Sequence, residues 1–306
     1  MKDKQQIFRT GLIFTILVAT AMLVAGCNLF LGLFETGTLK LSLADSPIDA
    51  QNVDGVWITI TEIQYHKNDK WVTMEEYKGG KYNLLELTGG NSTLLGELRL
   101  TAGEYNQIRF MLDAPERGSQ TPSNPGCYIS FTDGTTEALF VPSGSETGYK
   151  AVGAFTVPEN GEVSVTADFD VRKSVVEAGV SGIYILKPTI RLVVDDQAGK
   201  ITGTVTYNGT NEIIIYAYED GSWADTEDDD PATEESRFPD AVVSGKVNDD
   251  DSYALPYLAG GTYDLVVTEY SGSDFVSTLG FVSDVAVESG KTTSQDIDTA
   301  NLDSSP

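Results

Sequence analysis

Apolar residues alternate with polar ones along most of the chain, which is the pattern of β-strands that bury one face. No window of comparable length shows the helical period of about 3.6 residues. The clearest strand runs over 162–171, where every second residue is apolar: Val163, Val165, Ala167, Phe169 and Val171. Gly, Pro, Asn and Ser separate such segments, as turns require. We therefore predict an all-β fold of sandwich-type domains.

The same alternation predicts two local features in the first third of the chain. The apolar residues of 56–60 share one parity, whereas Ile63 has the other, so a β-bulge near Thr61 and Glu62 would return them to one face. The polar tetrapeptide at 67–70 is predicted to be a hairpin turn.

A change in composition at 194–199 divides the strand-rich sequence into two units. We predict tandem β-sandwich-type domains over 37–194 and 199–299. Within the second, residues 219–240 are rich in Asp, Glu, Ser and Pro and are predicted to form an exposed loop. The polar tail at 300–306 is expected to be frayed.

The first 26 residues have the order of a secretory signal, with basic residues before an apolar run at 12–24 and small residues before Cys27. The stretch Leu23-Val24-Ala25-Gly26-Cys27 resembles the lipobox of bacterial lipoproteins. This resemblance implies that the Cys27 thiol carries diacylglycerol, that the chain is cut between Gly26 and Cys27, and that the new amino terminus is acylated. Residues 27–36 would then be a lipidated tether.

An uncleaved anchor helix is the alternative to a lipoprotein signal. The run at 12–24 is 13 residues long, short of the roughly 20 needed to span a bilayer, but apolar residues continue to Phe34. Both readings place the body of the protein outside the cytoplasm, on a membrane of the cell envelope. The sequence does not distinguish the inner from the outer membrane.

The charge of the chain excludes one class of partner and suggests another. Removing residues 1–26 leaves 17 Lys and Arg against 45 Asp and Glu, a formal net charge of −28. Such a chain repels nucleic acid. Solubility is the general explanation of this acidity, and a calcium-binding site is the specific one. Its candidate ligands are Asp168 and Asp170, which share a strand face, with Asp45 nearby. The alternative is that they are solvated or pair with Arg172 or Lys173.

Few other residues suggest chemistry. His66 is the only histidine, which excludes sites built from several histidines. Cys127 has no partner once Cys27 is lipidated, and its strand-like surroundings predict a buried small hydrophobe. Trp57 faces away from its neighbours' core and could stack on a sugar or cover another layer, whereas Trp223 in the acidic loop is expected to be exposed.

These observations favour a non-catalytic binding or surface-interaction role. The alternatives are a carbohydrate- or calcium-binding envelope protein and, from another class, an envelope hydrolase that uses paired carboxylates. The partners expected are the lipid membrane, and a glycan or an envelope protein.

The first unit resembles the bacterial lipoprotein family catalogued as domain of unknown function 4382, from about Gly37 to Leu192. The resemblance implies an extracytoplasmic β-domain on an envelope lipoprotein and brings no established activity. The matching pieces are Ala44-Asp45-Ser46-Pro47, the 56–63 strand, Tyr82-Asn83-Leu84-Leu85-Glu86-Leu87, the 100–109 segment, Asp168-Phe169-Asp170 and Tyr184-Ile185-Leu186-Lys187-Pro188.

The second unit resembles the carboxypeptidase-regulatory or transthyretin-like β-sandwich. The resemblance rests on Asp251-Ser252-Tyr253-Ala254-Leu255 and on the 258–265 segment. The family usually has a glycine between the Asp and the Ser, and this chain lacks it. The resemblance implies a spacer or a stabilising appendage.

Mass spectrometry of the native protein should find a chain that begins at a diacylglyceryl Cys27 and fractionates with membranes. Hydrocarbon chains on one sulfur are sufficient for this, because each buried methylene contributes about 0.8 kcal/mol. An unmodified start at Met1, or free protein in the cytosol, would contradict the lipoprotein prediction.

Overall fold

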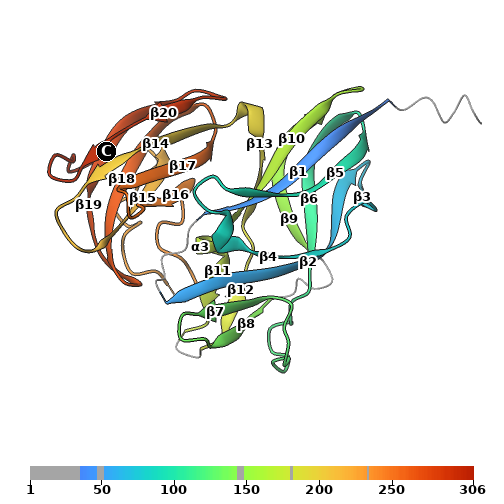
Figure 1. Cartoon of the computed structure of the whole chain (residues 1–306), viewed down its shortest axis with the longest axis horizontal. Coiled ribbons are helices and arrows are strands. Elements are labelled where there is room, and N and C mark those ends of the chain that lie inside the picture. The colour runs from blue at the N-terminus through green and yellow to red at the C-terminus, as the bar shows by residue number, and fades with distance from the viewer. Residues whose placement is uncertain (1–34, 47–51, 143–147, 180–181, 233) are drawn as a thin grey trace, which may run out of the picture.

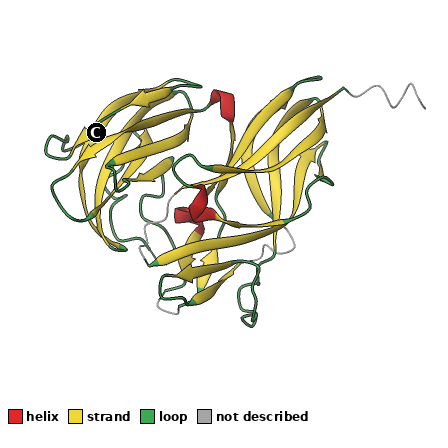
Figure 2. Cartoon of the chain, in the orientation of Figure 1, coloured by secondary structure: helices red, strands yellow, loops and turns green. Residues whose placement is uncertain are grey.

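In the computed structural model of the chain, two lobes lie side by side, one formed by strands β1 to β13 between residues 36 and 194 and one by strands β14 to β21 from residue 199 onward (Figure 1). Strands are the main regular structure of both lobes, and the helical segments are short (Figure 2), which confirms the all-β prediction. The structure describes residues 35–46, 52–142, 148–179, 182–232 and 234–306. The lipobox lies outside these ranges, and within them no helix has the length and apolar character to cross a bilayer.

The described part of the first lobe contains thirteen strands and two short helical turns, and a third turn, η2, leads to the second lobe. One sheet joins all the strands in the order β11-β12-β8-β7-β2-β6-β9-β13-β10-β1-β5, with β3 and β4 paired to β2. The elements are β1 (Thr36–Ser46), β2 (Val53–Lys67), β3 (Lys70–Thr73), β4 (Gly80–Asn83), η1 (Leu84–Leu87), β5 (Ser92–Thr101), β6 (Gly103–Leu112), β7 (Tyr128–Phe131), β8 (Thr136–Phe140), β9 (Tyr149–Val157), β10 (Glu162–Asp170), α3 (Val171–Ser174), β11 (Val175–Glu177), β12 (Tyr184–Leu186), β13 (Ile190–Val194) and η2 (Asp195–Gln197).

One apolar core fills this lobe, and the alternation of the sequence positions it. Strands β1 and β10 are parallel neighbours, with Leu41 opposite Val165 and Leu43 opposite Ala167, so their apolar faces coincide. All four side chains are at most 1% exposed. Cys127 lies in the same core and is also fully buried, as predicted. Burial raises the pKa of its thiol to about 12.

Both local predictions for the first lobe are confirmed. The register of β2 against β6 shifts between Ile60 and Glu62, and this bulge keeps Ile60 and Ile63 buried on one face. Strands β2 and β3 form a hairpin whose two turn residues, Asn68 and Asp69, have φ of 50° and 58°. Asn and Asp tolerate this left-handed backbone better than other side chains.

The second lobe is built from two four-stranded sheets. The first has the order β17-β14-β20 with β21 paired to β14, and the second has the order β16-β15-β18-β19. The core between them includes Ile201, Leu255 and Val267. The strands are β14 (Gly199–Thr206), β15 (Glu212–Glu219), β16 (Val243–Lys246), β17 (Ser252–Leu258), β18 (Gly261–Ser271), β19 (Asp274–Val287), β20 (Thr292–Ser294) and β21 (Ile297–Asp298).

The acidic segment 219–240 is a loop, as its composition predicts, and most of its described residues are exposed, but its aromatic residues pack inward. Phe238 is fully buried against Tyr216, and Trp223 is half-buried against Tyr218 and Phe238, which forms a second core on the outer face of β15 and β18. Glu227 is buried too, and its carboxylate accepts a hydrogen bond from the Tyr218 hydroxyl at 2.8 Å. The few aromatic residues therefore determine the fold of this segment, although acidic residues dominate its composition.

The tail is also more ordered than predicted. The backbone of Asp303 exchanges two hydrogen bonds with Phe281 in β19, at 2.9 and 3.0 Å. Leu302 packs against the core of the second lobe. One apolar side chain in an otherwise polar tail is sufficient to dock it.

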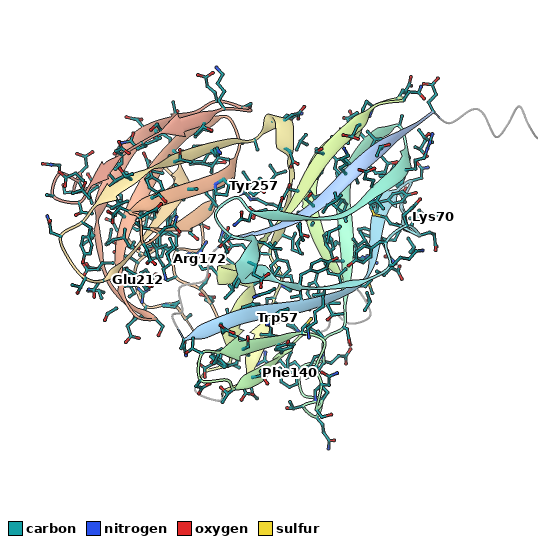
Figure 3. All side chains as sticks on the ribbon, in the orientation of Figure 1. Trp57, Lys70, Phe140, Arg172, Glu212 and Tyr257 are labelled. Atoms are coloured by element: carbon teal, nitrogen blue, oxygen red, sulfur yellow. The ribbon has the colours of Figure 1, made fainter. Side chains whose placement is uncertain are left out.

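A buried arginine joins the two lobes. Arg172 in α3 is 5% exposed, and its Nη1 donates to the backbone carbonyls of Arg237 and Phe238 at 2.8 and 2.7 Å (Figure 3). Its Nη2 donates to Asp170 at 3.2 Å. The next residue, Lys173, reaches the Ala241 carbonyl at 2.7 Å. Cations of the first lobe thus satisfy carbonyls of the second, which fixes the lobes to each other.

We predict that Arg172→Ala lowers the free energy of unfolding by about 3–5 kcal/mol, because it leaves the Asp170 charge buried beside unpaired carbonyls. Urea titration followed by tryptophan fluorescence measures the loss. Arg117→Ala is the matched control, since Arg117 also crosses between the lobes, to Glu234, but is 45% exposed. It should cost several times less. Equal losses for the two variants would contradict this role of Arg172.

Candidate functional site

The row of acidic residues on β10 is buried, and cations of the chain already neutralise it. Asp168 and Asp170 share a face, as predicted, but they are only 3% and 6% exposed. The guanidinium of Arg191 on β13 holds Asp168, with Nε at 2.8 Å and Nη2 at 2.6 Å. Asp170 binds Arg172 at 3.2 Å and Lys173 at 3.6 Å. The alternative of ion pairing is therefore confirmed for Asp170, whereas Asp168 has a different partner, Arg191.

Asp45 does not join these two carboxylates. It is paired in register with Phe169, so its side chain lies on the opposite face of the sheet from Asp168 and Asp170. Its Oδ1 accepts the backbone N–H of Val171 at 3.0 Å, while its buried Oδ2 has no hydrogen-bond partner among the described residues. Burial raises the pKa of Asp45 well above its usual range. No group of three His, Cys, Asp or Glu suited to a metal ion occurs among the described residues, and calcium binding stays a prediction.

Trp57 is half-buried and has several partners within the protein. Its indole Nε1 donates to the Ser130 hydroxyl at 3.3 Å, and its ring stacks on Tyr128 with the centroids 6.0 Å apart. The Lys81 ammonium lies 5.5 Å from the Trp57 ring and 4.3 Å from the Tyr128 ring. These contacts leave less of the ring for a sugar than the sequence suggested. Sugar binding at Trp57 stays a prediction.

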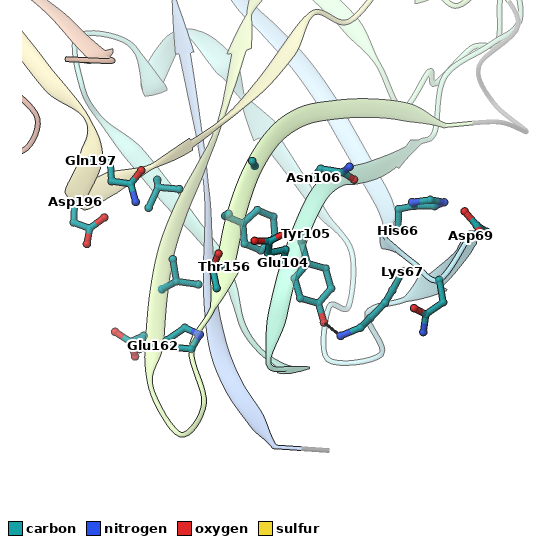
Figure 4. A pocket seen from close by; sticks show the side chains of 16 residues that line it. His66, Lys67, Asp69, Glu104, Tyr105, Asn106, Thr156, Glu162, Asp196 and Gln197 are labelled. Atoms are coloured by element: carbon teal, nitrogen blue, oxygen red, sulfur yellow. Dashed lines mark hydrogen bonds between the residues drawn. The ribbon is translucent and has the colours of Figure 1, made fainter. Parts of the chain in front are cut away.

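A groove of about 900 Å³ lies on the first lobe, away from these residues (Figure 4). The tip of the β2–β3 hairpin lines one side, β6 and β9 contribute the floor, and the start of β10 with η2 lines the other side. The groove exists because neighbouring strands diverge. β13 touches β9 at one register pair, Arg191 with Val152, and the chain then turns away at η2 toward the second lobe.

The rim of the groove is acidic. Asp69, Glu104 and Asp196 line it, and in the described chain they form no ion pair. A fourth acid, Glu162, pairs with Lys40 at 2.8 Å. The cation of the groove, Lys67, is directed to the floor, where its ammonium donates to the Tyr105 hydroxyl at 2.8 Å and to the Thr101 carbonyl at 3.3 Å.

Burial lowers the pKa of Lys67 and raises that of Tyr105, because desolvation disfavours the charged form of each side chain. Their mutual hydrogen bond holds the floor of the groove in place. The rim carboxylates stand around that floor and can accept hydrogen bonds or balance positive charge. This arrangement suits a polar ligand that carries positive charge.

The pattern of residues along the chain did not predict this groove. Its residues come from six separate elements between His66 and Gln197, and no local motif connects them. The one signal was the predicted turn at 67–70, which does contribute to the wall.

The fold and the groove define an all-β protein of two fused β-units with an acidic groove. The chain belongs to the family described as Domain of unknown function (DUF4382), whose model matches residues 36–188. That match covers the first lobe up to β12 and confirms the resemblance of the first unit to this family, whereas the lipoprotein signal stays a prediction. The match does not extend over the second lobe, whose resemblance to the carboxypeptidase-regulatory sandwich stays a prediction.

Comparison with curated proteins finds no match. Among solved structures, the chain is similar to the Bacillus anthracis TIE protein, with 13% identity over 86% of this chain and 34% of that one, at a TM-score of 0.20. It therefore spans about a third of that protein's length. A minor pilin of Streptococcus agalactiae has 11% identity over 85% of this chain and 94% of that one, at a TM-score of 0.19. The Porphyromonas gingivalis fimbrial anchor protein Mfa2 has 10% identity over 79% and 81%, also at 0.19. TM-scores this low carry no argument about function.

Compared with the parent, the Asp45→Asn variant should gain in free energy of unfolding as the pH rises from about 4 to 7. The native state holds the proton on Asp45 to a higher pH than the unfolded state, whose Asp pKa is about 3.9. Stability contributed by this group is therefore complete below that value and is lost as the pH rises through the native pKa. An amide cannot ionise, so the variant lacks this loss.

Urea unfolding of the parent and the variant at pH 4 and at pH 7 tests the effect. At pH 4 the Asp45 side chain of the parent is largely neutral in the native state, as the asparagine of the variant is at any pH. The exposed Asp54→Asn serves as the control. A difference between Asp45→Asn and the parent that is the same at both pH values would show that Asp45 has no raised pKa.

Proposed function

We propose that the protein is a lipid-anchored, non-catalytic binding module of the bacterial cell envelope, which captures a positively charged polar ligand in its acidic groove. The groove carries the proposal, since it combines a concave surface with three carboxylates that no cation of the described chain neutralises. A cationic segment of an envelope protein is the class of ligand that this surface favours.

The position of the groove relative to the chain start supports a membrane-proximal role. The backbone of Thr36 accepts the N–H of Asn160 at 2.9 Å, and Thr38 donates to Gly161 at 2.9 Å, so β1 begins beside the turn between β9 and β10. Pro158 of that turn lines the groove. The nine residues from Cys27 to Glu35 span at most about 30 Å when extended. A lipid on Cys27 would hold the groove within that reach of the bilayer.

The buried ion pairs argue against the hydrolase alternative. Paired catalytic carboxylates must flank an open position for the substrate. Asp168 and Asp170 are instead enclosed with Arg191, Arg172 and Lys173 between the sheet and the second lobe. Their arrangement serves the joining of the lobes.

Binding of a short oligolysine peptide to the full-length protein in neutral detergent tests the groove. Glu104→Gln and Asp196→Asn should each weaken the binding about two- to fivefold, the range for one exposed charge pair. Higher ionic strength should weaken binding further. Isothermal titration calorimetry measures both effects. Glu137→Gln, which removes an exposed acid on β8 outside the groove, is the matched control.

Two outcomes of this titration would contradict the proposed ligand class. One is a loss of affinity in Glu137→Gln equal to that in the groove variants, which indicates attraction by net charge alone. The other is binding of a neutral chito-oligosaccharide that the groove variants weaken, with no binding of oligolysine.

A further inference from the structure

Strand β5 is the last strand of its sheet, and β1 is its sole strand partner in the described chain. An exposed strand edge offers unpaired N–H and C=O groups to another strand. The segment is also accessible, since Leu94 is 54% exposed and the Glu97 side chain is 59% exposed.

The hydrogen-bond pattern identifies which backbone groups of β5 face outward. Ala102 donates its N–H to the Glu35 carbonyl, so in the antiparallel β1–β5 ladder the even-numbered residues of β5 near this end bond to β1. The odd-numbered residues Glu97 and Arg99 therefore direct their N–H and C=O groups to the free edge. Thr101 agrees with this alternation, because its carbonyl accepts the side chains of Lys67 and Tyr105 rather than a group of β1.

The tripeptide Glu97-Leu98-Arg99 is complementary to itself. When two copies of β5 pair antiparallel about Leu98, Glu97 of one copy lies opposite Arg99 of the other, and the reverse pair forms by symmetry. Residues directly opposite each other project from the same face. Both side chains are exposed on that face, and two cross-strand ion pairs result.

The backbone and the charges select the same register. Glu97 and Arg99 have their backbone groups free, so each of these two opposing pairs can exchange both N–H···O bonds, with Leu98 at the non-bonded position on the two-fold axis. A shift of this axis by one residue to either side would place Glu97 opposite Glu97 or Arg99 opposite Arg99.

We infer that the protein forms a two-fold symmetric homodimer in which the β5 edges of two copies pair antiparallel about Leu98. Symmetric self-pairing of one surface is the commonest form of homo-oligomer. Present contacts do not prevent it. Glu97 lies 3.9 Å from Lys40, and Arg99 donates to the Thr36 hydroxyl at 3.0 Å, but both contacts are exposed and can rearrange at little cost.

The inferred dimer agrees with the lipid tether, and this step alone rests on the proposed function. Thr36 is paired with Thr101, three residues from the two-fold axis, which is about 10 Å along the strand. Both tethers therefore begin close to the axis and can enter one membrane. Confinement to a surface would raise the local concentration of the two copies.

A β-bulge limits the pairing to a short stretch. The register of β5 on β1 shifts between the partners of Leu41 and Ser42, which leaves Leu95 without an opposite residue. Bulges interrupt a strand edge and so prevent open-ended association. At the other end, Lys67 and Tyr105 already cover Thr101. These two features restrict the contact to a closed dimer.

Charge reversal tests the register in the full-length protein in neutral detergent, by sedimentation equilibrium at moderate salt. Glu97→Arg and Arg99→Glu should each weaken dimerisation about tenfold or more, because attraction becomes repulsion at both symmetric pairs. The double variant Glu97→Arg/Arg99→Glu should dimerise like the parent. An equal mixture of the two single variants should form the mixed dimer, in which both pairs are again opposite in charge.

Two further variants control for net charge, which matters in a chain of formal charge −26. Glu137→Arg and Lys200→Glu make the same charge changes at exposed positions outside β5 and should leave the dimer unchanged. A parent protein that stays monomeric, or single variants that dimerise like the parent, would overturn the inference. Neither result depends on the oligolysine titration, so the groove and the dimer can fail separately.

Discussion

The organisation of the molecule depends on the burial of one guanidinium between two β-units. Arg172 binds Asp170 of its own lobe and two carbonyls of the other, and its guanidinium lies 5.3 Å from the ring of Tyr216. A buried charge is tolerated only when its donors are satisfied. Each lobe therefore supplies part of what the other needs, and the junction has a defined geometry.

Strand β10 connects this junction to the rest of the fold. One face contributes Val165 and Phe169 to the core, while the other carries Asp168 and Asp170 into ion pairs. Its first residue, Glu162, reaches the rim of the groove. The strand thus runs from the candidate binding surface to the contact between the lobes.

The sequence predicted those parts of the fold that short-range periodicity determines. The bulge near Thr61, the turn at 67–70 and the inward face of β10 follow from the alternation of neighbouring residues. It did not predict that the polar face of β10 is buried, because the second lobe and Arg191 provide that burial from a distance. The aromatic packing of 219–240 was missed because composition averages out single residues such as Phe238.

The candidate site could not be predicted from the sequence, for a related reason. A groove is formed by the divergence of strands, and the departure of the chain at η2 from the sheet is a property of the topology. The net charge of the sequence did bear on the acidic character of the groove. The chain has only 20 Lys and Arg, and Arg172, Lys173 and Arg191 are used in buried or half-buried ion pairs. These three cations are paired with two buried carboxylates, Asp168 and Asp170, so they change the surface charge little. The unpaired carboxylates around the groove follow instead from the excess of 46 Asp and Glu over 20 Lys and Arg in the chain.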